Sequence, residues 1–314
     1  MFLFFSRRII NFVVTLFIAS VVVFASMNVL PGDPALTILG LDATEDALEA
    51  LRQKLGLNEP LIKRYFLWVR NALTGDFGIS HSFSVPVSEL ITERLPLTVS
   101  LAISGMLFTV TFAFILGVFA AANHRRSGDW GVMIASQLGI AVPAFWLSIL
   151  LVLLFAVKLR WLPPGGFPGW ENPADAIRSL ILPTLALTLV QSAVLARVTR
   201  SSMLEVMRQD YIRTAHASGF HRRRILWRHT LPNALIPIVT IIGMQFAALV
   251  TGTIVIENVF YLPGLGKLIF QSISNRDLPT VQALVMLFAA IVIIANFIVD
   301  IAYSIIDPRL KERV

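Results

Sequence analysis

Residues 197–233 read RVTRSSMLEVMRQDYIRTAHASGFHRRRILWRHTLPN, a polar stretch between two strongly apolar segments. It carries eight arginines and no lysine. Gly219 follows a helix-forming run at residues 211–218, where glycine is a natural terminator, and residues 222–229 favour a second short helix ending near Pro232. Two such helices across a membrane face would form a rigid element that a soluble partner can bind. The alternative is a plain arginine-rich loop that contacts lipid headgroups.

The composition of the chain indicates a membrane protein. Of its 314 residues, 56% are hydrophobic and 14% are charged, and the mean hydropathy is +0.76. Soluble domains are about a quarter charged. A pI near 10.2 would suggest a nucleic-acid partner in a soluble protein, but here the basic residues follow membrane topology, so no nucleic acid is expected. The absence of Cys excludes disulfides and thiolate metal sites, and the five His residues have no metal-binding spacing.

Six apolar segments are long enough to cross a hydrocarbon layer of about 30 Å, which needs roughly 20 residues. They are residues 9–30, 97–122, 132–157, 180–196, 235–256 and 281–306. The fourth is the weakest, with 17 residues and an internal Pro183. The first resembles a signal peptide, but it exceeds the usual core of roughly 7–15 residues. It is therefore predicted to be an uncleaved anchor.

Lys and Arg residues are divided unevenly between the two sides. With the N-terminus inside, the inner segments hold 15 of them and the outer segments hold 11. Six of those 11 lie in residues 31–96, and long translocated segments largely escape the positive-inside rule. Without that segment the ratio is 15 to 5. Both termini are therefore predicted on the inner side.

The outer segment 31–96 is predicted to fold rather than to act as a linker. Residues 42–57 and 61–73 have amphipathic helical spacing, and Gly56 is a plausible stop for the first of them. A second outer loop, residues 158–179, contains two tryptophans and the run Pro163-Pro-Gly-Gly166. Interfacial tryptophans and a rigid turn are typical of a loop that follows the membrane surface.

Motifs for nucleotide chemistry are incomplete in this sequence. Gly264-Leu-Gly-Lys267 lacks the upstream glycine of a phosphate loop and the Ser or Thr after the lysine. Asp76-Phe77-Gly78 has none of the other kinase motifs around it. No catalytic constellation is found. Any energy that the protein uses is therefore expected from a partner protein or from an ion gradient.

The polar stretch resembles the loop between the fourth and fifth spans of permeases from binding-protein-dependent ABC importers. Their general pattern is EAA, three residues, Gly, nine residues, I, any residue, LP. Arg213-Thr-Ala215 stands at the EAA position, Gly219 is in register, and Leu231-Pro232 closes the motif. His229 replaces the Ile. The departure from EAA matches the peptide and nickel branch, which reads YxRTAxAxG and then RHxxxNAxxPxxT.

This resemblance extends along the whole chain. The matching motifs include Leu30-Pro-Gly-Asp-Pro34, Leu55-Gly-Leu57 with Pro60, Gly75-Asp-Phe-Gly78, Arg94-Leu-Pro96, Pro143-Ala-Phe-Trp146, Trp161-Leu-Pro163, Thr199-Arg-Ser201, Arg228-His229, Asn233-Ala234, Pro237, Thr240, Pro263-Gly-Leu-Gly266 and Asp307-Pro-Arg309. In this order and spacing they resemble the B-type permease of dipeptide, oligopeptide, nickel and glutathione importers.

The resemblance implies a six-helix type I ABC importer permease fold in a bacterial or archaeal inner membrane. Its implied parts are an N-terminal anchor helix (1–30), a periplasmic segment (31–96), a permease core (97–306) that includes the coupling loop (197–233), and a cytoplasmic tail (307–314). The implied partners are a second homologous permease, two ATPase subunits and a periplasmic or lipid-anchored substrate-binding protein. This chain would bind no cofactor, and ATP and Mg would lie on the ATPases. The residues implied to couple ATPase closure to the pore are Tyr211, Arg213, Thr214, Ala215, Ala217, Gly219, Leu231 and Pro232.

Polar residues inside the apolar segments leave several interpretations open. Asp300 is the carboxylate placed inside a predicted span, on one helical face with Asn296, and it serves either helix packing or ion coupling. Gln191 and Gln245 are candidates for a pore lining, but membrane helix packing explains them equally well. The alternative functions are a gradient-driven secondary transporter or channel, which predicts more midplane charges, and a membrane-bound enzyme.

Overall fold

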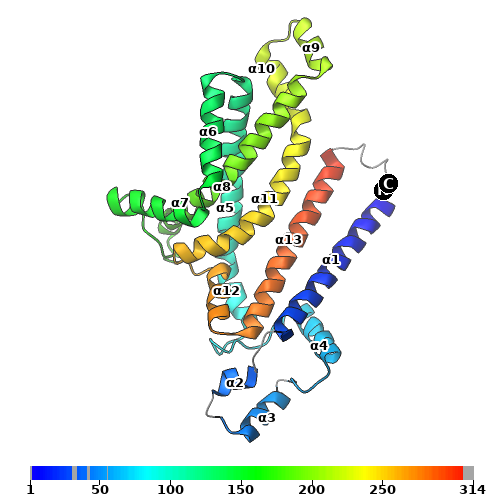
Figure 1. Cartoon of the computed structure of the whole chain (residues 1–314), viewed down its shortest axis with the longest axis vertical. Coiled ribbons are helices and arrows are strands. Elements are labelled where there is room, and N and C mark those ends of the chain that lie inside the picture. The colour runs from blue at the N-terminus through cyan, green and yellow to red at the C-terminus, as the bar shows by residue number, and fades with distance from the viewer. Residues whose placement is uncertain (1, 30–33, 41–42, 55, 307–314) are drawn as a thin grey trace.

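The computed structural model describes residues 2–29, 34–40, 43–54 and 56–306 (Figure 1). Within these ranges the regular structure is helical, apart from one isolated antiparallel bridge between Ile79 and Pro86. Five helices are long and apolar enough to cross a membrane, and a sharply bent pair of helices adds a sixth candidate span. The predicted class, an all-α membrane protein with six spans, is confirmed at this level.

The long helices are α1 (Phe2–Val29), α5 (Val87–Ala122), α8 (Pro173–Met207), α11 (Leu231–Val259) and α13 (Leu278–Ile306). The shorter ones are α2 (Pro34–Leu39), α3 (Glu45–Lys54), α4 (Leu61–Leu73), α6 (Ser127–Ala141), α7 (Ala144–Leu151), α9 (Asp210–Ala217), α10 (Arg222–Arg224) and α12 (Leu265–Ser274). Two π-helical segments, η1 (Val152–Lys158) and η2 (Ile225–Thr230), continue α7 and α10.

The third predicted span is not one straight helix, which corrects the prediction for residues 132–157. Helices α6 and α7–η1 meet at an angle of 104° (Figure 1). Pro143 lacks a backbone N–H, and a proline disfavours helical geometry in the residue before it. Val142 accordingly has an extended ψ of 122°. The sequence showed an apolar run of sufficient length but did not reveal this break.

Helices α5 and α8 are longer than the predicted spans. Helix α5 begins at Val87 rather than at residue 97, and α8 covers residues 173–207 rather than 180–196. With 36 and 35 residues, each is about 53 Å long at 1.5 Å per residue, well beyond a hydrocarbon layer of about 30 Å. Both helices therefore project past the membrane and carry the elements at either end of the molecule.

The second predicted short helix does not end near Pro232. Residues 222–259 form one continuous helix instead, because η2 leads directly into α11. Proline has no backbone N–H and cannot donate a hydrogen bond within a helix. The wider π-helical turn of η2 ends at Thr230, two residues before Pro232. Pro232 thus lies in the first turn of α11 rather than after a helix.

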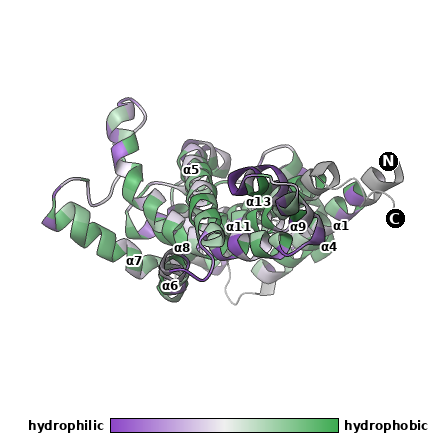
Figure 2. Ribbon diagram, turned by 90° about the horizontal axis from the view of Figure 1, so that it is seen from above, coloured by the Kyte–Doolittle hydropathy of each residue, from purple (hydrophilic) through white to green (hydrophobic). Residues whose placement is uncertain are grey.

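The core lies between α5, α8 and α11, with buried clusters along the length of α5. A close approach occurs at Gly117 of α5, where a Cβ atom would lie 2.6 Å from Thr199 of α8. Small residues at such crossings let membrane helices pack closely. The long helices are mostly hydrophobic (Figure 2), and many of their large hydrophobic side chains are exposed. In the most apolar stretch of helix α1, 11% of the residues are buried, and the helix packs mainly on α13.

The two ends of the bundle carry different elements (Figure 1). The α9 end holds α9, α10 and the turn between α5 and α6, and the opposite end holds α2, α3, α4 and α12. The predicted helix at residues 61–73 is α4, which is joined to α1 by a 2.7 Å hydrogen bond between Ser20 and Tyr65. The predicted helix at residues 42–57 is the shorter α3, and Gly56 follows it with a φ of +67°.

Candidate functional site: the α9 end of the bundle

Helix α9 has one face packed on the protein and one face open. Ile212 is 1% exposed and Ala215 is 8% exposed, and both pack against Ile225 of η2. The open face includes the exposed residues Tyr211, Arg213, Thr214 and Ala217. Partial desolvation raises the pKa of the Tyr211 hydroxyl above its ordinary value of 10.0, so the hydroxyl is a neutral donor at physiological pH. The helix is therefore held in place while presenting polar groups outward.

The end of α9 is closed by a Schellman motif. The amide of Phe220 donates to the carbonyl of Ala215 at 3.2 Å, and the amide of Gly219 donates to the carbonyl of His216 at 3.0 Å. Gly219 has a φ of +77°, in the left-handed region that favours glycine, and a Cβ atom there would meet nothing within 4 Å. Glycine is required at this position by backbone conformation rather than by space, which confirms the predicted stop.

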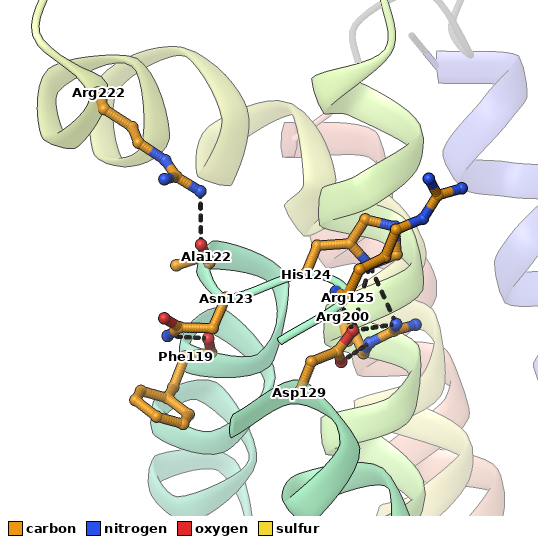
Figure 3. A network of polar contacts seen from close by, with 8 residues as sticks. All are labelled: Phe119, Ala122, Asn123, His124, Arg125, Asp129, Arg200 and Arg222. Atoms are coloured by element: carbon orange, nitrogen blue, oxygen red, sulfur yellow. Dashed lines mark hydrogen bonds and ion pairs between the residues drawn. The ribbon is translucent and has the colours of Figure 1, made fainter. Parts of the chain in front are cut away.

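The chain after Gly219 is tied to the bundle by polar and aromatic contacts. Arg222 donates from Nη2 to the carbonyl of Ala122, the last residue of α5, at 2.5 Å (Figure 3). The rings of Phe220 and His229 are stacked with centroids 5.8 Å apart. Two other implied coupling residues continue this element into α11, where Leu231 packs on a core cluster and Pro232 is exposed.

A buried ion pair braces the helices beneath α9, and sequence reasoning missed it. Asp129 of α6 is 3% exposed and accepts hydrogen bonds from Nε and Nη2 of Arg200 in α8 (Figure 3). The backbone amide of Arg125 also donates to this carboxylate, at 3.0 Å, and His124 Nδ1 lies 3.2 Å from it. The available signal in the sequence was that Asp129 lies within four positions of Arg125 and Arg126. The cluster fixes the α5–α6 turn against α8.

A second buried carboxylate, at the opposite end, also lies in a long helix. Glu257 of α11 is fully buried and accepts from the Thr98 hydroxyl at 2.6 Å and from the amides of Gly266 and Lys267 at 2.6 and 3.1 Å. These two amides belong to the first turn of α12, so the carboxylate caps that helix. Asp300 was singled out from the sequence as the carboxylate inside a span, but Glu257 also lies in a long apolar helix.

Asp277 is likewise fully buried and joins residues far apart in the sequence. It precedes α13 and accepts hydrogen bonds from the hydroxyls of Ser80 and Thr280 at 2.5 and 2.8 Å. The backbone amide of His81 donates to it at 3.1 Å. Burial lowers the pKa of the His81 side chain, and the negative charge of Asp277 opposes that shift. This contact fastens the segment after α4 to the start of α13.

The remaining polar residues singled out from the sequence are separated in the structure. The side-chain amide of Gln245 is 6% exposed and donates to the backbone carbonyl of Gln191 at 2.9 Å, between α11 and α8. This contact favours the packing interpretation for Gln245, and a pore lining by either glutamine stays a prediction. Asn296 is exposed, while the side chain of Asp300 lies outside the described residues. Among the described residues, no group of three acidic or His side chains could hold a metal ion.

The chain is thus a multi-pass helical bundle that carries at one end an anchored helix, α9, with an exposed polar face. Residues 113–312 match the family of binding-protein-dependent transport system inner membrane components, and residues 1–102 match the N-terminal region of such membrane components. The chain belongs to this family. It is thus a permease component of an ABC importer in the inner membrane, and separate subunits hydrolyse ATP. Membership decides against both alternatives, the gradient-driven transporter and the membrane-bound enzyme.

Individual relatives and a solved structure agree with this assignment. A Brucella abortus (strain 2308) protein named as a peptide transport system permease is 43% identical over 306 residues, covering 97% of this chain and 98% of that protein. The glutathione transport system permease protein GsiC of Escherichia coli (strain K12) is 40% identical over 307 residues, covering 98% of each. The MetNI methionine ABC transporter in an inward facing conformation matches with a TM-score of 0.57 at 18% identity, covering 69% of this chain and 96% of that chain. This last similarity supports the fold.

Proposed function

We propose that this permease carries di- or oligopeptides, or a related small solute such as glutathione, and that α9 transmits ATPase closure to the pore. The substrate class rests on relatives that span nearly the whole chain and are named for peptide and glutathione transport. The coupling role rests on one observation above the others. Helix α9 keeps six of its eight residues exposed, while Ile212 and Ala215 on the opposite face and its C-terminal end are fixed to the bundle.

The structure of α9 sharpens the roles proposed for its residues. Tyr211, Arg213, Thr214 and Ala217 are the proposed contacts with an ATPase surface. Ala215 is buried within the chain, so its small side chain serves the packing of α9 on Ile225. Gly219 sets the turn. An ATPase that pushes on α9 would thereby move η2 and α11, because residues 222–259 form one helix.

The proposed assembly pairs this chain with a second, different permease, two ATPase subunits and a substrate-binding protein. ATP and Mg would bind to the ATPases and not to this chain. The α9 end and both termini are proposed to be cytoplasmic, which agrees with the excess of arginine at that end. The periplasmic segment 31–96, together with residues 158–179 and 258–280, would contact the binding protein around the pore mouth.

The coupling role is tested by reversing one charge on the open face of α9. Arg213 is 75% exposed at its side chain and pairs only with Asp210 on the same helix among the described residues. Arg213→Glu should therefore leave the fold intact and reduce substrate-stimulated ATPase activity in the reconstituted transporter by about tenfold or more. Arg126→Glu, an exposed reversal in the α5–α6 turn at the same end, is the control. Equal stimulation in both variants would show that α9 does not couple the ATPases.

A further inference from the structure

An open basic pocket lies on the first turns of the helix that runs from α10 through η2 into α11. It has a volume of about 730 Å³ and is lined by His221, Arg223, Arg224, Trp227, Arg228 and Pro232. The fold and the proposed coupling by α9 leave the three arginines and the tryptophan without a role. None of the four is among the residues implied to couple the ATPases.

The pocket faces away from α9. Ile225, Leu226 and Thr230 are the buried residues of this stretch, and Ile225 is the one that packs on α9. Arg223 and Trp227 are each two positions from Ile225, about 160° around the helix axis, so both point to the opposite side of the same helix. A partner seated on the open face of α9 would therefore leave this surface directed elsewhere.

The three guanidinium groups in the pocket lack acidic partners. Within the described ranges, Arg223, Arg224 and Arg228 form no ion pair, whereas Arg200 pairs with Asp129 and Arg213 pairs with Asp210. Arg224 lies 4.7 Å over the ring of Phe220, a contact that leaves its charge uncompensated. Guanidinium groups bind phosphate oxygens through several parallel hydrogen bonds. The chemistry of the pocket therefore fits a phosphate-bearing anion.

The pocket lies on the polar side of the apolar part of this helix. Arg228 is three residues and Arg223 is eight residues before Leu231, the first residue of α11. The predicted apolar segment begins shortly after it, at residue 235, so the arginines lie on the side where lipid headgroups flank the hydrocarbon. Trp227 between them is 54% exposed, as is typical of tryptophan at a membrane interface.

We propose that this pocket binds the phosphate of an anionic phospholipid headgroup in the leaflet at the α9 end. Arg223, Arg224 and Arg228 bind the phosphate oxygens, and the Trp227 ring packs against the glycerol region. A lipid held there lies on the helix that leads from the coupling loop into α11, and steadies it against the membrane surface. This inference goes beyond the proposed function and needs neither ATP nor substrate.

The test is retention of phosphatidylglycerol by the assembled transporter. The complex is purified from nanodiscs with equal parts of phosphatidylglycerol and phosphatidylcholine, and the bound lipids are counted by native mass spectrometry. A variant with Arg223→Gln, Arg224→Gln and Arg228→Gln should lose its preference for phosphatidylglycerol, by about fivefold for each arginine removed. The matched control carries Arg125→Gln, Arg126→Gln and Arg208→Gln, three exposed arginines at the same end, and should retain the lipid.

Four outcomes would overturn the lipid site. Equal loss in both triple variants would show a general charge effect, and retention in both would show that the pocket binds no lipid. If the pocket variant loses its ATPase subunits while keeping its lipids, this surface binds protein instead. A preference that inorganic phosphate removes at matched ionic strength would assign the site to a free phosphate. Since lipid counting requires no coupled transport, a failure of the coupling role of α9 would not affect this result.

Discussion

The two ends of the bundle satisfy their polar groups in opposite ways. At the end that holds α12, the carboxylates of Glu257 and Asp277 are fully buried, and each accepts three hydrogen bonds from residues of other segments or from the helix it caps. At the α9 end, Tyr211, Arg213 and the pocket arginines are exposed. These buried groups are satisfied within the chain, whereas the charges on the open face of α9 and in the pocket are exposed.

This difference distinguishes residues that stabilise the fold from residues that are proposed to bind partner subunits. Buried polar groups are costly to leave without a partner, whereas exposed ones are hydrated by water and contribute little to stability. Substitutions at the first end should therefore lower stability, and substitutions on the open face of α9 should lower coupling with little change in stability. The following predictions test that separation.

The largest expected loss of stability is at Glu257. Glu257→Ala would leave the amides of Gly266 and Lys267 and the Thr98 hydroxyl without an acceptor in a site closed to water. The free energy of unfolding should fall by roughly 4 kcal/mol, since each orphaned group costs about 1–3 kcal/mol before relaxation. Thermal unfolding in detergent measures it, with Glu93→Ala, an exposed carboxylate on α5, as the control. Similar melting of the two variants would contradict the proposed cap.

The second prediction compares a buried ion pair with an exposed one at the same end. Asp129→Ala removes a buried acceptor and leaves Arg200 unpaired, which should cost about 3 kcal/mol of folding free energy. Asp210→Ala removes the partner of Arg213, in a pair whose side chains are 94% and 75% exposed. That change should leave the melting temperature unaltered. Equal effects on the melting temperature would contradict the distinction between a buried, stabilising ion pair and an exposed one at the α9 end.

The smallest expected effect is local and concerns the turn after α9. Gly219→Ala places a side chain at a φ of +77°, which should cost about 1 kcal/mol. Hydrogen exchange of the α9 amides should accelerate about fivefold. Gly131→Ala in α6 is the control, because its Cβ meets nothing within 4 Å and helical geometry favours alanine there. Unchanged exchange in α9 would show that the turn is not what holds the end of this helix.

The sequence predicted local elements well and long-range contacts poorly. Helix α4 has the predicted bounds, 61–73, and Gly219 ends α9 as expected, because amphipathic spacing and a left-handed glycine are local signals. The sequence did not predict the break at Pro143 or the continuous helix from residue 222 into α11. Both depend on whether the helix ends or continues at a proline, which residue spacing alone does not determine.

The contacts of the buried carboxylates could not be predicted from the sequence either. Thr98 and Glu257 are 159 positions apart, and Ser80 and Asp277 are 197 apart. No single-sequence pattern joins residues at such separations. Ala215 shows a related limit, since it was implied to be a coupling residue and the structure places it on the packed face of α9, against Ile225. Composition and spacing singled out the polar stretch, and the structure was needed to tell which face of α9 is open.

The most direct test of the division of α9 into two faces is site-specific crosslinking to the ATPase. The chain has no cysteine, so Ala217→Cys and Ala215→Cys each introduce a single reactive thiol, one on the exposed face and one on the buried face. In the assembled transporter, Ala217→Cys should crosslink to an ATPase cysteine with a yield that changes when ATP is added, and Ala215→Cys should not crosslink. Crosslinking from position 215 but not from 217, or from neither, would contradict the proposal that the open face of α9 receives the ATPase.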